Sequence, residues 1–470
     1  MTIRLHDTLS GEVRPLVPLR DDRVGVYTCG PTVYGPAHIG NFRSFLFADL
    51  LIRHLRRRGL TVTWVMNITD IDDKIIRGAA ATGEPIDVLA ELYLAMFLSD
   101  AAALRMTIPD VLPRATRHVD EIVALIAVLL ERGHAYRTDD GSVFFRIASW
   151  PAYGRLARLD PEGMRVGERV EADEYGKDDV RDFVLWKGPK PGEPSWETAI
   201  GPGRPGWHIE CSAMSMRHLG PSFDIHTGGV DLNFPHHEDE IAQSEAATGQ
   251  PFVGTWLHCA HLQMGGAKMA KSTGNIARVG ALLAGGISPR ALRLALISVH
   301  YRAGLNHSDD SLAAAGAAIE RLDAVVAALS TYTQTGPDDP GLDERLEAAT
   351  IAFGEALDDD LNISAALAVV FDLVRDLNRR MERRLLSTAD TGRALETLRD
   401  LDEVLAILPD AATDLEPEVA ALLEERVAAR TARDFASSDR LRDELAAHGI
   451  TVEDTRDGQR WRRNVEVGHG

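Results

Sequence analysis

The segment TCGPTVYGPAHIGN, residues 28–41, decides the fold, because the pattern changes from strand to helix across it. Before it, RVGVYT (residues 23–28) is short and largely apolar, which is typical of a buried strand. After it, FRSFLFADLLIRHLRRRGL (residues 42–60) has apolar residues at helical spacing and ends near Gly59, as helices often do. TVTWVMNIT (residues 61–69) is rich in β-branched residues and predicts the next strand.

A strand, a loop, a helix and a strand in this order predict a parallel α/β sheet. Ligands bind such sheets beyond the carboxyl ends of the strands. The loop that contains Cys29 and His38 lies at that edge. Glycines and prolines surround Cys29, and a packed thiol, a nucleophile and a metal ligand are all open for it at this point.

The composition is that of an ordinary globular protein. Of its 470 residues, 45% are hydrophobic and 26% are charged, and this length predicts about two to four domains. The net charge of −20 argues against sequence-blind binding of a polyanion but leaves room for local basic patches. No apolar run reaches the roughly 18 residues of a membrane span, the N-terminus lacks a signal core, and three cysteines cannot form a disulfide framework. We therefore expect a soluble cytoplasmic protein.

The pattern changes again further along the chain. Residues 90–134 read as helical, whereas residues 141–205 combine short strands with many glycines and prolines and indicate an insertion. Sheet patterning resumes near SFDIHTGG (residues 222–229) and continues to about residue 264. From about residue 285 the chain is helical, and it ends in a short strand pattern, HGITVEDTRDGQRWRRN (residues 448–464).

Two distant stretches could complete a metal site with Cys29. They are GWHIECSAM around Cys211 and NFPHHEDEIAQS, in which Pro235 suits the first turn of a helix. His236 and Glu240 would then share one helix face, while His237 and Glu238 point elsewhere. Two thiolates, an imidazole and a carboxylate suit zinc. The four candidate ligands are Cys29, Cys211, His236 and Glu240. From spacing alone, two buried thiols beside a solvated acidic helix start are an open alternative.

The lysines are rare and unevenly placed. The chain has 51 basic residues, only six of them lysines, and two of these six fall in KMAKS, residues 268–272. We call these five residues the lysine segment. Where arginine is the usual cation, a lysine pair indicates a need for compact and flexible charges. The alternative is an ordinary solvated turn.

Several of these stretches resemble one known family. CGPTVYGPAHIGN resembles the HIGH signature of class I aminoacyl-tRNA synthetases, and KMAKS resembles their KMSKS loop. NITDIDDKII, GWHIECSAMS, GGVDLNFPHHEDEIAQS and the C-terminal ARDFASSDRLRDELAAHGITVEDTRDGQRWRR are similar to cysteinyl-tRNA synthetases. Each motif alone is weak, but together and in this order they are specific and cover essentially the whole chain. We call residues 29–38 the signature loop.

The resemblance implies an α/β fold, with a Rossmann-type parallel-sheet catalytic domain, an insertion, an α-helical anticodon-binding bundle and a small C-terminal α+β segment. The expected segments are the first half of the catalytic domain (1–125), the insertion (126–205), the second half with the metal site (206–264), the KMSKS-type loop and stem-contact region (265–300), the helical tRNA-binding domain (301–411) and the C-terminal anticodon-recognition segment (412–470).

The resemblance also implies a reaction. L-Cysteine and ATP, with Mg²⁺, would form cysteinyl-adenylate, and the cysteinyl group would pass to the 3′ end of tRNA(Cys). One zinc ion, held by the four candidate ligands, would select cysteine over serine. The family further suggests a monomer.

Roles follow by resemblance for individual residues. The implied catalytic residues are His38, Asn41, Lys268 and Lys271. The implied ATP-binding residues are His38, Gly40, Asn41, Gly229, Asp231 and Lys271. Trp207 would line the cysteine pocket, with a core tryptophan as the alternative. His38 could instead only cap its helix. Ala270 departs from the family, which usually has serine there.

Two further features need an interpretation. Asp70, Asp72 and Asp73 invite a magnesium site, but we expect helix capping and local pairing with Lys74. The helical region and a basic terminal strip would contact tRNA, since cations beside a stacking ring suit unstacked bases. The strip consists of Arg456, Arg460, Trp461, Arg462 and Arg463.

Two rival functions share part of this pattern. A cysteine ligase of mycothiol biosynthesis would form the same adenylate but would not need the C-terminal third of the chain. A zinc-stabilised RNA-binding protein would not need His38, Lys268 and Lys271.

Overall fold

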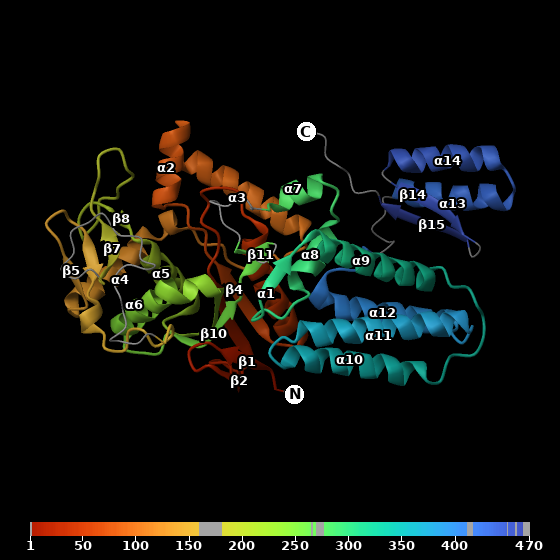
Figure 1. Ribbon diagram of the computed structural model, residues 1–470, viewed down its shortest axis with the longest axis horizontal. Coiled ribbons are helices and arrows are strands. Elements are labelled where there is room, and N and C mark those ends of the chain that lie inside the picture. The colour runs from red at the N-terminus through yellow and green to blue at the C-terminus, as the bar shows by residue number, and fades with distance from the viewer. Residues whose placement is uncertain are drawn as a thin grey trace. The chain divides into compact units, whose positions relative to one another are not determined.

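The computed structural model describes residues 2–158, 181–264, 267–268, 277–410, 417–448, 450–455 and 458–463 (Figure 1). The chain divides into two compact units. The first comprises residues 1–278, 296–307 and 355–363, and the second comprises residues 279–295, 308–354 and 364–470.

A four-stranded parallel sheet is the centre of the first unit. Its strand order is β10-β9-β3-β4. The strands are β3 (Arg23–Thr28), β4 (Thr61–Met66), β9 (Phe223–Gly229) and β10 (Val253–Cys259). Helix α1 (Ile39–Arg57) connects β3 to β4, and Gly59 follows it with a φ of 83°. The parallel α/β prediction is confirmed, including the strand that precedes Cys29.

Among the described residues, this unit also contains the α-helices α2 (Asp73–Thr82), α3 (Ile86–Ala103), α4 (Val119–Glu131), α5 (Trp207–Leu219) and α6 (Glu238–Thr248). The expectation of helix over residues 90–134 is wrong between α3 and α4. There the chain is extended beside β4, with Val111 bridging Val65, and two prolines in that stretch are incompatible with a continuous helix.

The insertion forms a separate antiparallel sheet in the order β5-β6-β7-β8. Its strands are β5 (Ala135–Arg137), β6 (Val143–Phe145), β7 (Phe183–Lys187) and β8 (Arg204–Pro205). Stacked rings of Phe145 and Phe183 lie in its core. Small sheets complete the unit, with β1 (Arg4–Asp7) on β2 (Glu12–Pro15), and β11 (Leu262–Met264) between β12 (Ala267–Lys268) and β13 (Leu305–His307).

The second unit is mainly helical. Helices α9 to α12 lie side by side in Figure 1 and bury apolar faces. The helices along this part of the chain are α7 (Val279–Ala284), α8 (Pro289–Ile297), α9 (Asp309–Ser330), α10 (Leu342–Asp358), α11 (Ile363–Glu382), α12 (Thr388–Leu405), α13 (Pro417–Thr431) and α14 (Phe435–Ala447). A hairpin of β14 (Ile450–Thr455) and β15 (Gly458–Arg463) follows, and its Trp461 packs partly against an apolar cluster that includes Leu445. The predicted helical region and C-terminal α+β segment are confirmed.

None of the helices in the described ranges is both long and apolar enough to cross a membrane. The exact domain boundaries stay predictions.

Candidate active site

The site lies where the carboxyl ends of β3 and β9 meet. The hydroxyls of Thr28 and Thr227 are 2.8 Å apart, and the Cys29 amide donates to the Thr227 carbonyl at 3.1 Å. The signature loop after β3 therefore begins beside the end of β9. This is the edge at which parallel sheets bind their ligands.

The four candidate ligands come together at this edge. Cys29 Sγ lies 3.8 Å from Cys211 Sγ and 3.6 Å from Glu240 Oε1. His236 Nε2 lies 3.1 Å from the same carboxylate oxygen. All four side chains are buried, and their ligand atoms lie within 4.8 Å of one another. Segments almost two hundred residues apart thus converge on one point.

The helix that carries the downstream pair starts where the sequence predicts. A short helical turn, η4 (Asn233–His237), leads directly into α6 at Glu238, and Phe234 is the residue inside this turn with non-helical dihedral angles. Pro235 follows Phe234 through a cis peptide bond, and the helical conformation runs from Pro235 onward. His236 and Glu240 therefore meet as an i,i+4 pair.

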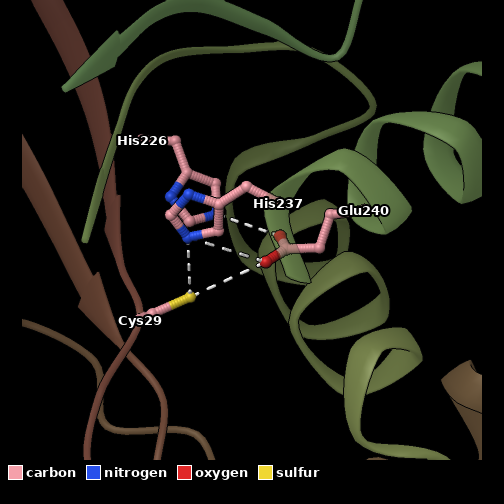
Figure 2. A group of neighbouring side chains, drawn as sticks. All are labelled: Cys29, His226, His237 and Glu240. Carbon is pink, nitrogen blue, oxygen red and sulfur yellow. Dashed lines mark hydrogen bonds and ion pairs between the residues drawn. The ribbon is translucent and has the colours of Figure 1, made fainter. Parts of the chain in front are cut away.

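A second group of buried side chains shares two members with the first (Figure 2). Cys29 Sγ lies 3.3 Å from His237 Nε2, and His226 Nε2 lies 2.9 Å from Glu240 Oε2. The expectation that His237 points elsewhere is wrong, because its ring lies against Trp256 and His258 of β10 and its Nε2 reaches Cys29. Glu238 does point away, and it accepts the amides of Gly154 and Leu156.

Buried hydrogen bonds fix the second group from behind. His237 Nδ1 lies 2.8 Å from His258 Nε2, and His258 Nδ1 lies 2.8 Å from Thr8 Oγ1. His226 and His258 were not predicted from the sequence. His226 lies in the middle of β9 and His258 near the carboxyl end of β10, so pairing those strands beside β3 would have placed both near Cys29.

The electrostatics separate the two thiols. Burial and the hydrogen bond with Cys211 raise the pKa of Cys29 well above its usual range. Burial also opposes ionisation of Cys211, but the Cys29 hydrogen bond and the charge of His236 lower the Cys211 pKa to about 6. Burial disfavours a charged His236, yet Cys211 and Glu240 raise its pKa to about 10. Burial would likewise raise the Glu240 pKa, but His226 and His236 lower it to about 2.

With these pKa shifts and no metal bound, two anions would face an imidazolium in a buried site. Such charges are tolerated inside a protein only when paired or bound to a metal. A divalent cation would replace the protons on Cys29 and His236. The donor set is compatible with a metal site.

Trp207 begins α5 and covers one side of this cluster. Its ring stacks on that of His236, with centroids 4.3 Å apart and an interplanar angle of 27°. The side chain is 37% exposed, so the alternative of a core tryptophan does not describe it. An exposed ring on a candidate ligand histidine is suited to contact a small substrate.

His38 lies at the other end of the signature loop and caps α1. Its Nδ1 accepts the Asn41 amide at 3.2 Å, and Asn41 Oδ1 accepts the His38 amide at 3.1 Å. His38 thus caps α1, and the same hydrogen bond fixes the orientation of its imidazole ring. An accepting Nδ1 places the proton of the neutral imidazole on Nε2, which becomes a donor.

Backbone pairing holds the chain on both sides of the lysine segment. Upstream, β12 pairs with β11, with Lys268 opposite Gln263. Downstream, the Ile39 amide donates to Ala277, and His38 bridges Arg278. The Lys268 side chain, Ala270 and Lys271 lie outside the described residues. The backbone that flanks them is attached to the start of α1.

Two of the adenosine-binding candidates, Gly229 and Asp231, lie at and just after the end of β9. A Cβ on Gly229 would lie 2.5 Å from Asp231 Oδ1, so a side chain there would displace the Asp231 carboxylate. The Asp231 side chain is 60% exposed. Gly40 lies in the first turn of α1.

The three aspartates after β4 have separate structural roles. Asp70 accepts from the amide and hydroxyl of Thr116, and Asp72 caps α2 by accepting the Lys74 amide. Capping is confirmed, and Lys74 meets Asp72 through its backbone amide, while no ion pair of the Lys74 side chain with these aspartates is found among the described residues. Asp73 instead pairs with Lys187 and Arg204 of the insertion sheet.

Of the basic terminal strip, Arg456 lies outside the described residues. The backbone of Arg460 to Arg463 forms β15, and Trp461 is partly buried.

Comparisons with known proteins assign the chain to a family. A model described as "tRNA synthetases class I (C) catalytic domain" matches residues 15–317. A "DALR domain" matches residues 352–409, and a "Cysteinyl-tRNA ligase anticodon binding domain" matches residues 412–462. The chain belongs to the cysteine–tRNA ligase family.

Relatives in this family match over their full length. The cysteine–tRNA ligase of Solibacter usitatus is 47% identical over 466 residues, which cover 98% of this chain and 100% of the relative. That of Alkalilimnicola ehrlichii is 46% identical over 473 residues, with the same coverage. The alternative of a mycothiol ligase is not supported, because full-length relatives are cysteine–tRNA ligases and the C-terminal part matches an anticodon-binding domain.

Solved structures show the same fold in other class I synthetases. The methionyl-tRNA synthetase of Mycobacterium tuberculosis with methionyl-adenylate has a TM-score of 0.57 at 17% identity, covering 82% of this chain and 90% of that one. The leucyl-tRNA synthetase of Agrobacterium radiobacter, in a ternary complex with tRNA, has a TM-score of 0.60 at 12% identity, covering 83% and 85%.

Proposed function

We propose that this chain is a cysteine–tRNA ligase that makes cysteinyl-adenylate from L-cysteine and ATP and transfers the cysteinyl group to the 3′ end of tRNA(Cys). One observation carries the proposal, which is the buried group of thiols, imidazole and carboxylate at one end of the loop whose other end opens α1. Such a loop can hold the sulfur and the activated phosphate of one adenylate. Membership of the family supports the same reaction.

At the sulfur end, Cys29, Cys211, His236 and Glu240 would hold zinc. A bound zinc ion would take the cysteine thiolate as a further ligand and discriminate against serine, whose hydroxyl is harder and less acidic. Shape alone separates the two amino acids by only about 1–3 kcal/mol. Trp207 would close the pocket over the substrate.

The second group of ligands has a supporting role in this proposal. His226 and His237 reach Glu240 and Cys29 from the sheet side, and His258 fixes the ring of His237. Such partners orient the ligands of a metal and raise their basicity. The set with two thiolates is preferred because sulfur ligands hold zinc firmly.

At the phosphate end, no enzyme nucleophile is required, since the cysteine carboxylate attacks the α-phosphate of ATP. His38 Nε2 would donate to the phosphates, and Lys268 and Lys271, with Mg²⁺, would neutralise the charge that develops. Asn41 would hold His38 in place through the capping box. Gly229 and Asp231 would bind the adenosine, with Asp231 accepting from a ribose hydroxyl.

The transfer step needs the tRNA. The helical region over residues 301–411 and the segment over residues 412–470 would bind it, as the matched DALR and anticodon-binding domains support. The basic strip of the β14–β15 hairpin would contact the anticodon. A cytoplasmic monomer is proposed, as the family suggests, and light scattering on the pure protein would check the monomeric state.

A charging assay tests the proposal. The purified protein is mixed with ATP, Mg²⁺, labelled cysteine and total tRNA, and parallel reactions contain labelled serine. We expect charging with cysteine only, confined to the cysteine-accepting tRNA. Pyrophosphate exchange with cysteine but no charging would contradict the tRNA step, and absence of exchange would contradict the whole proposal.

A further inference from the structure

Helix α1 buries an arginine near its first residue. Arg43 lies five residues after His38, in the second turn of the helix, and is only 2% exposed. Arginine is almost never buried so fully unless its charge is paired. Its burial in the helix that opens the phosphate end of the proposed site therefore needs an explanation.

Backbone carbonyls hold the guanidinium of this arginine. Its Nε donates to the carbonyl of Ala260, its Nη1 to that of Leu296, and its Nη2 to those of His300 and Ala303, at 3.1, 3.4, 3.4 and 2.5 Å respectively. None of these hydrogen-bond partners, which all lie in the described part of the chain, is a carboxylate. Carbonyl dipoles thus replace a counter-ion, and two stretches that are distant in sequence converge on one side chain of α1.

The packing around Arg43 leaves no room for a ligand. The cavity beside it has a volume of about 10 Å³, which is enough for at most one water molecule. Another lining residue, Phe47, lies one turn further along α1, and its ring stacks on Tyr301 with centroids 4.4 Å apart and an interplanar angle of 14°. Arg43 and Phe47 therefore attach residues 296–303 to α1, and this part of the molecule holds backbone rather than a small molecule.

The attached stretches lead into the lysine segment. The Ala260 amide donates to the Tyr301 carbonyl at 2.7 Å, and strand β11, which begins two residues after Ala260, pairs with β13. Strand β11 also pairs with β12, in which Lys268 lies opposite Gln263. The upstream side of the lysine segment is thus connected to Arg43 through backbone hydrogen bonds.

The downstream side is attached to the same part of α1. The Ile39 amide donates to the Ala277 carbonyl at 3.0 Å, and His38 bridges Arg278. Both flanks of the lysine segment are therefore attached within the first two turns of one helix. Displacing a reacting group by about 1 Å can lower a rate about 100-fold, so these attachments bear directly on catalysis.

We propose that Arg43 is a positioning residue, which holds the strand before the lysine segment against the start of α1 and so sets where Lys268 and Lys271 meet the ATP phosphates. The inference rests on the proposed function. Arg43 acts through the backbone and does not touch the substrate. Arginine is required because its planar fork presents five donors in a fixed geometry, whereas a lysine ammonium is a point charge with three.

Arg43→Lys tests the inference, because it keeps the charge but removes the fork. We expect kcat for pyrophosphate exchange, per folded molecule, to fall about 100-fold, since the lysines act on the transition state. The KM for cysteine and the zinc content should stay those of the wild type. A purely structural role would instead lower the Tm and the folded fraction without changing kcat per folded molecule. Exchange of labelled pyrophosphate is measured on the fraction that elutes as native protein in gel filtration.

A double-mutant cycle with Lys271→Ala shows whether Arg43 acts through the lysine segment. Arg43→Lys should lower kcat about 100-fold in the wild type but less than about tenfold in the Lys271→Ala background, because one of the two groups that it positions is already gone. Arg43→Gln, which buries no charge, decides the matter in the same assays if Arg43→Lys fails to fold.

Arg53→Lys is the matched control on the same helix. Arg53 also donates to a backbone carbonyl, that of Arg105 at 2.8 Å, and it pairs with Asp49. Arg105 lies between α3 and α4 and not in the strands that lead into the lysine segment. The exchange rate of this variant per folded molecule should therefore be that of the wild type.

Two results would overturn the inference. One is exchange at the wild-type rate per folded molecule of Arg43→Lys. The other is the same fold-loss in both backgrounds, which would show that Arg43 acts independently of Lys271. A wild type without exchange, or a fully active Lys271→Ala, contradicts the proposed function and the inference with it. An active wild type with either of the first two results refutes only the inference.

Discussion

The two ends of the signature loop are built in opposite ways. Around Cys29, the ligand candidates and the histidines behind them are buried and hydrogen-bonded to one another. Around His38, the side chains are half-buried, and Asp231 is largely exposed. A rigid, dry end is suited to choose one kind of atom, whereas an open end must admit ATP and release pyrophosphate. Under the proposed function, selection and turnover would thus be separated along ten residues of chain.

The strongest test of this contrast removes a buried ligand. Cys211→Ala should lose the metal and reduce pyrophosphate exchange by roughly 1,000-fold or more, beyond the 10–100-fold typical of residues behind the ligands. Zinc content by mass spectrometry and exchange rates measure the two effects. Cys259→Ala is the matched control, since this buried thiol is outside both ligand groups. A Cys211→Ala protein with full zinc and activity would contradict the metal site.

His38→Asn tests the open end. Asparagine is a good helix cap, so the free energy of unfolding should change by less than about 0.5 kcal/mol. The loss of the imidazole donor should lower adenylate formation about 100-fold, while the zinc content stays that of the wild type. Chemical denaturation and pyrophosphate exchange separate the roles. Full activity would show that His38 only caps α1.

Replacing either of the two adjacent histidines distinguishes the two ligand groups. His236→Ala should abolish zinc binding, whereas His237→Ala should weaken it by about 10–100-fold, because His237 supports Cys29 from behind. Competition with a chromophoric chelator measures both affinities. The reverse order of effects would assign the metal to the group that contains His226 and His237.

The smallest effect concerns Asp73, which belongs to neither end. Burial would raise its pKa, but Lys187 and Arg204 lower it from 3.8 to about 2. A lowered carboxyl pKa stabilises the fold above about pH 4, and this stability is lost as the pH falls through about 2. Since the side chain is 36% exposed, Asp73→Asn should cost only about 1 kcal/mol at pH 7 and less at pH 3, by urea denaturation. An altered Mg²⁺ dependence of exchange would instead favour the magnesium interpretation.

The sequence predicted the parts of this molecule that depend on local pattern. The strand before Cys29, the helix after His38 and the later return to sheet all follow from apolar periodicity. The predicted helix over residues 90–134 was wrong in part. The spacing of the apolar residues between α3 and α4 resembles that of a helix, and only the position of β4 shows that they lie in an extended segment beside it. His226 and His237 could not be assigned because their approach depends on strand order and on the turn at Pro235. Cys211 was assigned as a candidate ligand from the order of the family motifs, because no spacing rule connects it to Cys29.

The hydrogen bonds at the start of α1 have a consequence for product inhibition. A helix normally offers several unpaired amides to an anion. Here Ile39 donates to Ala277 and Asn41 donates to His38, so in the described contacts Gly40 is the remaining donor of the first three. One amide holds a free anion weakly. We therefore expect inorganic phosphate and sulfate to be poor inhibitors, and pyrophosphate to be retained mainly by the lysine segment.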